Sequence, residues 1–491
     1  MFADSISENF YIYGAGQYAR IMVSWLQAKK LKDRVRGCIV SNRDSGQEDF
    51  CGIPIFAFDA VVEQLNGVTV FIAIAVENAV GIAEKLDTVG AQGMHITYAL
   101  LDEMEGDLFD IFSADGKALD QVVVWNYWGM GYYDQCKYIV NELHRRNGKL
   151  KIYWILKDVV NTPLPDWITP ISIGSYEYYE VMSRSRILVT NVDSPSSCIY
   201  KRNFQYFIYT WHGIGPSKRL EWESPLHRKR IGNDKRIVQN RWNGADIMVA
   251  GSNCCHEVYR KSFLYEGKIE DWGYPRNDVL FNDISYKKRI YDTFGIDDKK
   301  KIILYAPTFR NELMENRDTE RLRQIYDIDL VKVREAAEKR FGGEFVVMYR
   351  FHNYVYRYVD ISSYKQNGID ATYYPDMQEL LKTVDILITD YSSSMWDFSL
   401  TKKPVFLYFH DAEEYEEKYQ GFYVFPDNYP YPKGHTNEEL CDAIASFDDE
   451  KYQADLDKWF KKYGTFDDGH ASERIADRVF DVIENPAKYG K

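Results

Sequence analysis

The sequence predicts an α/β protein of Rossmann-type domains, in which two successive βα units face a cleft and a smaller unit of the same kind precedes them. Two observations lead to this prediction. Short apolar runs alternate with segments of helical spacing along nearly the whole chain, a pattern typical of parallel sheets covered by helices. The length of 491 residues also exceeds one ordinary core and suggests about three domains.

The first unit is expected over residues 1–112. Its predicted elements are a strand with a glycine turn over 9–16, a helix over 17–30, and strands over 35–40 and 68–76. The turn contains Gly14, Gly16 and Ala19 in the spacing of the dinucleotide-binding fingerprint, so these residues form a candidate ligand loop. The second strand ends in Ser41-Asn42-Arg43 without the acidic residue that binds a ribose, which argues against NAD. A ligand-binding role and a structural or regulatory role both stay open.

The second and third units are expected over residues 120–285 and 286–491, after a polar, glycine-containing boundary at 113–117. In the second unit we expect strands over 121–126, 151–156 and 187–190 and a helix over 134–146. In the third unit we expect strands over 302–305, 345–349, 371–374, 386–389 and 405–408. Ligands of open α/β sheets bind beyond the carboxyl ends of the strands, where the distinctive polar residues of the third unit lie.

Composition excludes several classes of protein. A net charge of −13 argues against a general nucleic-acid binder, and seven cysteines without paired spacing argue against a disulfide framework or a zinc site. Residues 217–241 invert the charge, with eight Lys/Arg against three Asp/Glu, which suits a phosphate-rich substrate, an anionic membrane surface or a merely solvated face. No signal sequence is visible and the longest apolar run, 68–76, is too short to span a bilayer, so we expect a cytoplasmic protein with at most peripheral membrane contact.

The stretch 386–397 joins an apolar strand to an expected helix through Asp390 and a run of serines. A helix start offers unpaired backbone N–H groups and partial positive charge, so hydroxyls placed there can help to bind a phosphate. Asp390 or a serine could instead simply cap the helix.

Motifs in the second and third units resemble the CDP-glycerol glycerophosphotransferase family of teichoic-acid primases and polymerases, over about residues 120–485. The motifs occur here in the family's order: Trp211-His212-Gly213, Gly273-Tyr274-Pro275-Arg276-Asn277-Asp278, Leu304-Tyr305-Ala306-Pro307-Thr308-Phe309-Arg310, Arg350-x-His352, Thr389-Asp390-Tyr391-Ser392-Ser393, Gly421-Phe422-Tyr423 and Asp468-Gly469-x-Ala471-Ser472. The resemblance implies a GT-B-like fold whose C-terminal half binds most of the donor nucleotide.

The same resemblance implies a reaction. An acceptor hydroxyl attacks the β-phosphorus of CDP-glycerol or a related CDP-alditol, CMP is released, and a phosphodiester forms on a teichoic-acid-like, capsule, other surface-glycan or lipid-linked acceptor. Such chemistry needs a base, positive groups near the phosphoryl oxygens and alignment of the two substrates. No cofactor or metal is expected, since a helix terminus can neutralise the pyrophosphate.

The resemblance also implies site residues. His212 is the expected base and His352 the second catalytic histidine, sharing a strand face with Arg350. Arg276 and Arg310 are expected at the donor pyrophosphate, with structural ion pairs as the alternative, and Asn277 at the nucleotide or glycerol. The remaining expected donor contacts are Trp211, Gly213, Thr308, Thr389, Asp390, Ser392, Ser393 and Asp397.

Two features depart from the family pattern. Ile214-Gly215-Pro216 replaces the usual Thr-Pro after the histidine motif, a change that could alter the acceptor. The N-terminal unit is similar to the nucleotide-sugar-binding domain of bacterial sugar acetyltransferases, including the Gly52-Ile53-Pro54-Ile55 turn, but no hexapeptide repeat follows. It suggests a capsule or surface-glycan version of the reaction, with CDP-ribitol or another CDP-alditol as donor. A GT-B glycosyltransferase and a non-catalytic nucleotide-binding scaffold remain alternative functions.

Overall fold

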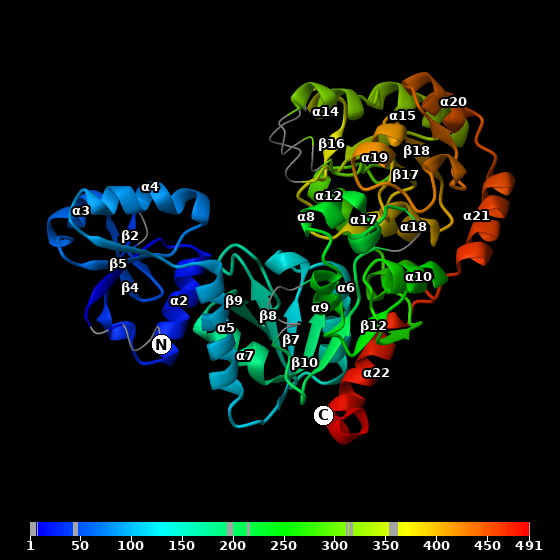
Figure 1. The fold of residues 1–491 in the computed structure, drawn as a ribbon. Helices are drawn as coiled ribbons and strands as arrows, with labels where there is room; N and C mark the ends of the chain where they lie inside the picture. Colours follow the sequence, from blue (N-terminus) through cyan, green and yellow to red (C-terminus); the bar gives the residue numbers. More distant parts are fainter. Residues whose placement is uncertain are drawn as a thin grey trace.

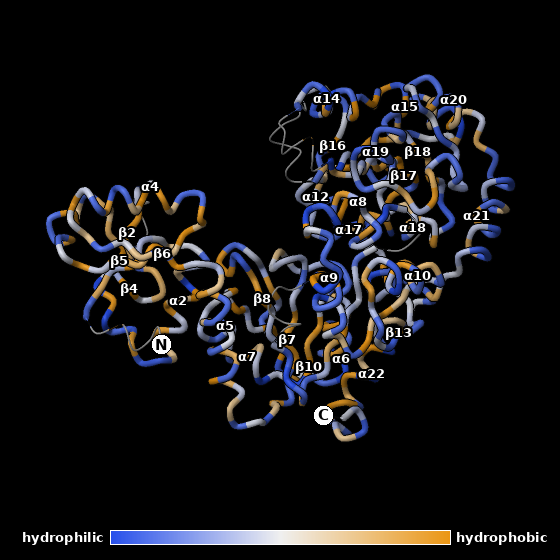
Figure 2. Tube along the Cα trace, viewed as in Figure 1, coloured by the Kyte–Doolittle hydropathy of each residue, from blue (hydrophilic) through white to orange (hydrophobic). Residues whose placement is uncertain are grey.

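The computed structural model describes residues 6, 8–42, 48–193, 200–213, 217–310, 313, 318–352 and 362–490. Three α/β units follow one another along the chain, each built on its own largely parallel sheet (Figure 1). The apolar residues concentrate on the strands and on the inner faces of the helices, and polar residues occupy the loops (Figure 2). The expected fold class is therefore confirmed.

The N-terminal sheet has the strand order β3-β4-β2-β1-β5-β6. Its strands are β1 (Phe10–Tyr13), β2 (Val35–Val40), β3 (Asp49–Phe50), β4 (Ile53–Ala57), β5 (Thr69–Ile72) and β6 (Gln92–His95), and its helices are α2 (Gln17–Ala28), α3 (Phe58–Val61), α4 (Val76–Asp87) and α5 (Tyr98–Ser113). Every pairing is parallel except β3 with β4. The predicted helix and the strand over 35–40 are confirmed, and β1 lies within the strand and glycine turn predicted over 9–16. The strand predicted over 68–76 is shorter than expected, since β5 ends at Ile72 and α4 begins at Val76.

The N-terminal unit shares a core with the second unit through α5, which lies between α2 and α7 (Tyr176–Arg184). Trp25 and Tyr179 belong to one continuous apolar cluster. Ser24 Oγ donates a hydrogen bond to the Gly174 carbonyl at 2.9 Å, and Tyr179 OH donates to Glu105 at 2.7 Å. Buried apolar contact of this kind holds the two units in a fixed orientation.

Gly14 has a structural role in the fingerprint turn. Its φ is +124°, and a Cβ on it would lie 2.7 Å from the Ala73 carbonyl oxygen of the neighbouring strand. Gly16 has no neighbour within 4 Å of its Cβ position, and its φ of −106° suits any residue. Close approach of β1 to the end of β5 therefore explains the first glycine without a ligand.

We expect Gly14→Ala to lower the free energy of unfolding by about 1–3 kcal/mol, because the added methyl meets a carbonyl in a strained backbone conformation. The matched change Gly16→Ala should leave stability unchanged. Urea denaturation of both variants checks this, and equal stability of Gly14→Ala and wild type would contradict it. A loss of nucleotide binding confined to Gly16→Ala would identify the loop as a ligand site.

The second sheet has the order β13-β12-β11-β10-β7-β8-β9 and is parallel throughout its described pairings. Its strands are β7 (Leu119–Trp125), β8 (Lys151–Leu156), β9 (Ile168–Ser172), β10 (Ser185–Thr190), β11 (Tyr206–Tyr209), β12 (Ile247–Val249) and β13 (Lys268–Glu270), with helices α6 (Asp134–Arg146), α7, α8 (Pro225–Arg230), α9 (Lys235–Trp242) and α10 (Asn253–Lys261). The predicted helix over 134–146 and strand over 151–156 begin and end where expected. The predicted strands over 121–126 and 187–190 correspond to β7 and β10.

The third sheet has the order β16-β15-β14-β17-β18-β19 and is also parallel. Its strands are β14 (Lys301–Tyr305), β15 (Phe345–Tyr349), β16 (Ile369–Asp370), β17 (Ile386–Thr389), β18 (Val405–Tyr408) and β19 (Lys433–Gly434). The helices of this part of the chain are α11 (Asp278–Phe281), α12 (Lys287–Phe294), α14 (Thr319–Ile325), α15 (Leu330–Phe341), α16 (Ser362–Asn367), α17 (Met377–Thr383), α18 (Ser394–Ser399), α19 (Ala412–Lys418), α20 (Asn437–Ala445) and α21 (Asp449–Tyr463).

One predicted strand is wrong. The strand expected over 371–374 is instead the two-residue β16, and residues 371–374 form a turn. The Asp370 side chain accepts a hydrogen bond from the Thr372 N–H at 2.9 Å, and the Tyr374 N–H donates to the Ala371 carbonyl at 3.1 Å. An aspartate that bonds the backbone two residues later starts a turn and ends a strand.

The chain returns to the second unit at its end, where α21 leads into α22 (Ala471–Glu484) (Figure 1). Ile475 and Val479 of α22 join the apolar cluster formed by the second sheet and α6. Arg478 donates to Glu270 of β13 at 2.8 Å. No helix in the described part of the chain combines the length and the apolar character needed to cross a membrane.

Candidate active site

A large cleft of about 2020 Å³ lies between the second and third units. Residues that follow strands of the second sheet, including Tyr127, Asp134 and His212, line one wall, and residues that follow β14, β15 and β17 line the other. The carboxyl ends of both parallel sheets thus meet at one place, as expected for a ligand site in open α/β sheets.

His212 is held in one tautomer. Its Nδ1 lies 2.7 Å from the Asn191 carbonyl oxygen, and because a carbonyl only accepts, Nδ1 carries the proton and Nε2 is left to accept one. The ring packs at 4.0 Å from the Trp211 ring and 5.0 Å from the Tyr127 ring, measured between centroids. Burial lowers the pKa of His212 below its ordinary value, so the imidazole is neutral at neutral pH and suited to act as a base.

Several residues around His212 have a left-handed backbone without being glycine. The φ angles are +39° at Tyr127, +54° at Trp128, +61° at Asp134 and +54° at Trp211. Such conformations cost free energy and persist only where the surroundings enforce them, which is common at functional sites. They support the interpretation of this wall as a site rather than a packed strand end.

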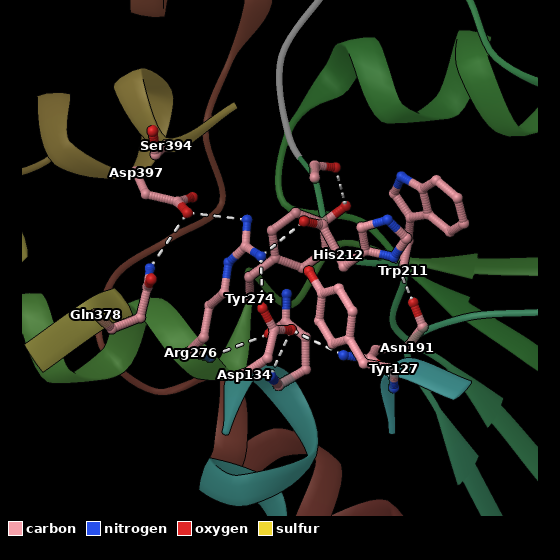
Figure 3. Close-up of polar contacts among 12 residues, drawn as sticks. Tyr127, Asp134, Asn191, Trp211, His212, Tyr274, Arg276, Gln378, Ser394 and Asp397 are labelled. Atoms are coloured by element: carbon pink, nitrogen blue, oxygen red, sulfur yellow. Dashed lines mark hydrogen bonds and ion pairs between the residues drawn. The ribbon is translucent and has the colours of Figure 1, made fainter. Parts of the chain in front are cut away.

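Asp134, Arg276 and Asp397 form an ion-pair chain that crosses between the units (Figure 3). Arg276 Nη1 lies 2.8 Å from Asp134 Oδ2, and its Nη2 lies 2.9 Å from Asp397 Oδ2. Nη1 also donates to the His212 carbonyl at 2.7 Å. Burial alone would lower the pKa of Arg276, but Asp397 and Asp134 raise it well above its ordinary value. Arg276 therefore holds the histidine segment and the third unit together.

Asn191 connects this ion-pair chain to the histidine. Its Nδ2 donates to Asp134 Oδ1 at 3.0 Å, while its Oδ1 accepts from the Tyr127 N–H at 3.0 Å. The same residue supplies the carbonyl that orients His212. A fully buried asparagine thus fixes both the aromatic loop after β7 and the tautomer of the histidine.

Asn277 and Gln378 extend the connection to the third unit. Asn277 Nδ2 donates to Asp397 Oδ1 at 3.1 Å, and Gln378 Nε2 donates to Asn277 Oδ1 at 2.8 Å. Burial raises the pKa of Asp397 above its ordinary value, although Arg276 opposes this. Asn277 is fully buried behind the cleft wall and acts as a connector between the units.

The serine junction opens α18 on the opposite wall. Ser392 and Ser394 are joined through their Oγ atoms at 2.9 Å, and Ser393 occupies the N-cap position without making a side-chain cap bond. A Cβ on Gly213 would lie 3.5 Å from Ser393 Oγ, so the histidine segment and the junction are direct neighbours. Ser392, Ser393 and Ser394 line the cleft that His212 also lines. The first N–H groups of α18 already have partners, since those of Ser394, Met395 and Trp396 donate to Ser392 Oγ and to the Ser392 and Ser393 carbonyls.

Asp390 does not cap α18. Its Oδ1 accepts from the Tyr391 N–H at 2.5 Å and from the Thr308 N–H at 2.8 Å, and its Oδ2 accepts from Arg310 Nη2 at 2.9 Å. It therefore orders its own turn and connects that turn to the loop after β14.

Arg310 lies beneath the cleft wall and not in it. It is 1% exposed. Its Nε donates to Asp411 at 2.9 Å, and its Nη1 donates to the Thr308 carbonyl at 2.9 Å. With Asp390 and Asp411 as partners, its guanidinium is directed toward protein groups, and this placement favours the structural ion pair over contact with a pyrophosphate.

Arg350, His352 and Thr308 present polar groups to the cleft. Arg350 Nη1 donates to the carbonyls of Ala371, at 3.1 Å, and Tyr374. No carboxylate of the described chain lies within ion-pair distance of Arg350, so its positive charge is available to an anion. Partial desolvation and the charge of Arg350 lower the pKa of His352. The His352 ring lies 4.5 Å from that of Phe309.

The predicted site residues divide into two groups. Those that line the cleft are His212, Arg276, Thr308, Arg350, His352, Ser392, Ser393 and Asp397. Those that lie behind its walls and support them are Trp211, Gly213, Asn277, Arg310, Thr389 and Asp390. Gly14, Gly16 and Ala19 belong to the separate N-terminal unit. Ile214-Gly215-Pro216 lies outside the described residues.

Sequence reasoning missed Asp134, Asn191 and Tyr127. Asp134 begins α6 just after the loop that follows β7, and Asn191 directly follows β10. Both therefore stand at carboxyl strand ends, the same position that singled out the serine junction. That rule, applied to the second sheet, could have identified them.

Two Rossmann-type units facing a cleft, with a neutral imidazole on one wall and a serine-rich helix start on the other, define the architecture of a GT-B-type transferase. The family model "CDP-Glycerol:Poly(glycerophosphate) glycerophosphotransferase" matches residues 109–481. The chain belongs to this family. The match covers almost none of the N-terminal unit, so the family model does not identify relatives of that unit.

Similar proteins agree with this assignment. A teichoic acid poly(glycerol phosphate) polymerase of Staphylococcus epidermidis is 28% identical over 77% of this chain and 53% of its own length. A teichoic acid glycerol-phosphate transferase of Staphylococcus aureus is 25% identical over 77% of this chain and 97% of its own. The structure of the wall teichoic acid polymerase TagF superposes with a TM-score of 0.67 and 27% identity, covering 78% of this chain and 94% of that one. The chain spans about half the length of the first two polymerases it matches.

Proposed function

We propose that the protein transfers glycerol phosphate, or a related alditol phosphate, from a CDP-alditol to a hydroxyl of a teichoic-acid-like, capsule or other surface-glycan acceptor, with release of CMP. The observation that carries this proposal is the tautomer of His212. A neutral imidazole with Nδ1–H fixed on the Asn191 carbonyl and Nε2 open to a substrate is what a general base requires.

The reaction follows from the arrangement of the cleft. The oxygen of the acceptor hydroxyl attacks the β-phosphorus while His212 Nε2 takes the proton of that hydroxyl. The bond between the β-phosphorus and the bridging oxygen then breaks, and CMP leaves with that oxygen. Arg350 and the hydroxyls of Ser392 and Ser393 before α18 stabilise the negative charge on the phosphoryl oxygens. His352 orients the phosphoryl group beside Arg350.

The proposal divides the work between the units. The second unit, 120–285, supplies the base and receives the acceptor, and the third unit, 286–491, binds the CDP donor, with α22 returning to support the second sheet. The N-terminal unit, 1–112, is a rigidly attached domain of the nucleotide-binding type. We place the protein in the cytoplasm, in peripheral contact with the anionic inner membrane surface, with no nucleic acid as partner and no required cofactor.

A donor screen tests the function. Purified protein is incubated with CDP-glycerol, CDP-ribitol, UDP-sugars and GDP-sugars, each with a polyol phosphate or lipid-linked acceptor, and the released nucleotide is identified. CMP release that depends on both donor and acceptor supports the proposal. UDP or GDP release with a glycoside product would identify a glycosyltransferase instead, and tight nucleotide binding without turnover would identify a scaffold.

Thr308 provides a sharper test of donor binding. Within the described chain its Oγ1 is buried without a hydrogen-bond partner, although the residue lines the cleft. Thr308→Val keeps the shape and removes the hydroxyl, so we expect donor affinity to fall by about tenfold, the effect of one hydrogen bond to a charged group. Isothermal titration with CDP-glycerol measures this.

The stability of Thr308→Val should equal or exceed that of wild type, because an unpaired buried hydroxyl is removed. Thr389→Val is the matched control, since the Thr389 hydroxyl donates to the Ala306 carbonyl at 2.7 Å inside the protein. That variant should lose stability and keep donor affinity. Unchanged donor affinity in Thr308→Val would remove the hydroxyl from the binding site.

A further inference from the structure

A second open pocket, of about 630 Å³, lies beside the active-site cleft. Its lining gathers Arg219, Arg228, Lys235 and Lys261 around the aromatic side chains of Trp222 and Tyr423. One carboxylate, that of Glu223, also lines the pocket and accepts a hydrogen bond from Ser262 Oγ at 3.0 Å. We call it the Trp222 pocket. Arg219, Arg228 and Lys235 come from residues 217–241, where the charge is inverted relative to the net charge of −13.

Two of these cations form no ion pair with any residue that the structure describes. The Arg228 guanidinium lies 5.7 Å and Lys235 Nζ 5.1 Å from the centroid of the Trp222 ring. Across the described residues, no carboxylate lies within ion-pair distance of either side chain. By contrast, Arg219 pairs with Glu416 at 3.2 Å and Lys261 with Glu257 at 3.0 Å. Arg228 and Lys235 are thus held near each other on an aromatic ring with their charges open to an anion.

The Trp222 pocket shares its walls with the cleft. Helix α8 sends Leu226, His227 and Arg230 to the cleft and Arg228 to the pocket. The antiparallel bridge between Lys218 and Phe422 forms the other shared wall. Lys218 lines the cleft, and Arg219 and Phe422 line the pocket. A flexible chain leaving the cleft past α8 therefore reaches the pocket directly.

We propose that the Trp222 pocket is an anion subsite that binds a phosphate group of the acceptor chain, while the terminal hydroxyl of that chain lies at His212. This inference rests on the proposed transfer of alditol phosphate units. A polyol phosphate chain presents charged groups separated by short polyol segments. Arg228 and Lys235 bind one phosphate, and the faces of Trp222 and Tyr423 contact the adjoining CH groups.

Binding of a short, fluorescently labelled glycerol phosphate oligomer tests the subsite without requiring turnover. The double variant Arg228→Ala/Lys235→Ala should weaken oligomer binding by about tenfold or more, since two charge-assisted contacts are lost. Its affinity for CDP-glycerol should stay unchanged. The matched control is Lys229→Ala/Arg236→Ala, which removes the same charge from the same helices at exposed positions that line neither cavity. Fluorescence anisotropy at fixed ionic strength measures all three proteins.

Equal weakening in both double variants would overturn the proposal, because general attraction to a basic surface would then explain the binding. Lipid headgroups are another source of phosphate, and sedimentation with phosphatidylglycerol vesicles measures whether the pocket binds them. If the pocket variant loses vesicle binding and keeps oligomer binding, the pocket contacts lipid headgroups and the proposal fails. Wild-type protein could bind the oligomer at this pocket and yet release no CMP. That result would contradict the proposed reaction but would still support the subsite.

Discussion

Replacing His212 with asparagine is expected to lower turnover by about 10²–10⁴-fold, the contribution of a general base. An asparagine amide can still donate to the Asn191 carbonyl in place of the imidazole Nδ1–H. The variant therefore keeps the local hydrogen bond and loses the basic Nε2, together with the ring contacts to Trp211 and Tyr127. The affinity for the CDP donor should change little, because we assign the donor mainly to the opposite wall. Steady-state CMP release and calorimetry of the donor measure the two effects separately.

The pH dependence gives the same base an independent signature. Burial holds the pKa of His212 below its ordinary value of about 6.5. The base acts when unprotonated, so kcat/KM should rise as pH rises through this lowered pKa and should be level at neutral pH. The acid limb should thus lie on the acid side of about 6.5, the value of an unperturbed histidine, and should be absent from the His212→Asn profile.

His352→Ala serves as the comparison, because His352 and Arg350 both lie on the wall to which we assign the donor. It should reduce both turnover and donor affinity. If His212→Asn retained wild-type turnover with its acid limb intact, another group would be the base.

The fold was accessible from sequence because its strands are covered on both faces and therefore read as short apolar runs. Strand β17 is buried along its whole length, and β7 is buried over its last five residues. The error at 371–374 came from a residue that acts through its side chain: Asp370 bonds the Thr372 N–H and ends the strand early. Hydrophobic pattern carries no information on such a bond.

The site was accessible only in part, for a different physical reason. A motif shows that residues occur together but not which way their side chains point. Ser392 and Arg310 both stand beyond strand ends, yet the serine faces the cleft and the arginine is enclosed by carboxylates. Asp411, which completes the enclosure, lies outside every motif that we recognised. Long-range pairing of this kind is visible only once the sheets are assembled.

Replacing Arg310 with alanine is expected to lower the free energy of unfolding by about 3–5 kcal/mol, the cost of leaving a buried charge without its partner. Burial alone would lower the pKa of Arg310, but Asp390 and Asp411 raise it well above its ordinary value, so the side chain is charged throughout the physiological range. Its removal leaves two carboxylates facing each other, at 3% exposure each, without a cation. Guanidinium chloride denaturation measures the loss.

Arg350→Ala is the matched control, because Arg350 is also an arginine of the third unit that follows a strand but has backbone carbonyls as partners. Its loss should cost less stability and should weaken donor binding more, since Arg350 lines the cleft and pairs with no carboxylate among the described residues. Arg310→Lys keeps the charge but not the bidentate geometry with Asp411, so it should fall between wild type and Arg310→Ala in stability and provides folded protein if the alanine variant fails to fold. Should the Arg310 variants unfold like wild type and lose donor affinity, the guanidinium would have to reach the pyrophosphate, and the ion pairs with Asp390 and Asp411 would have to open when the donor binds.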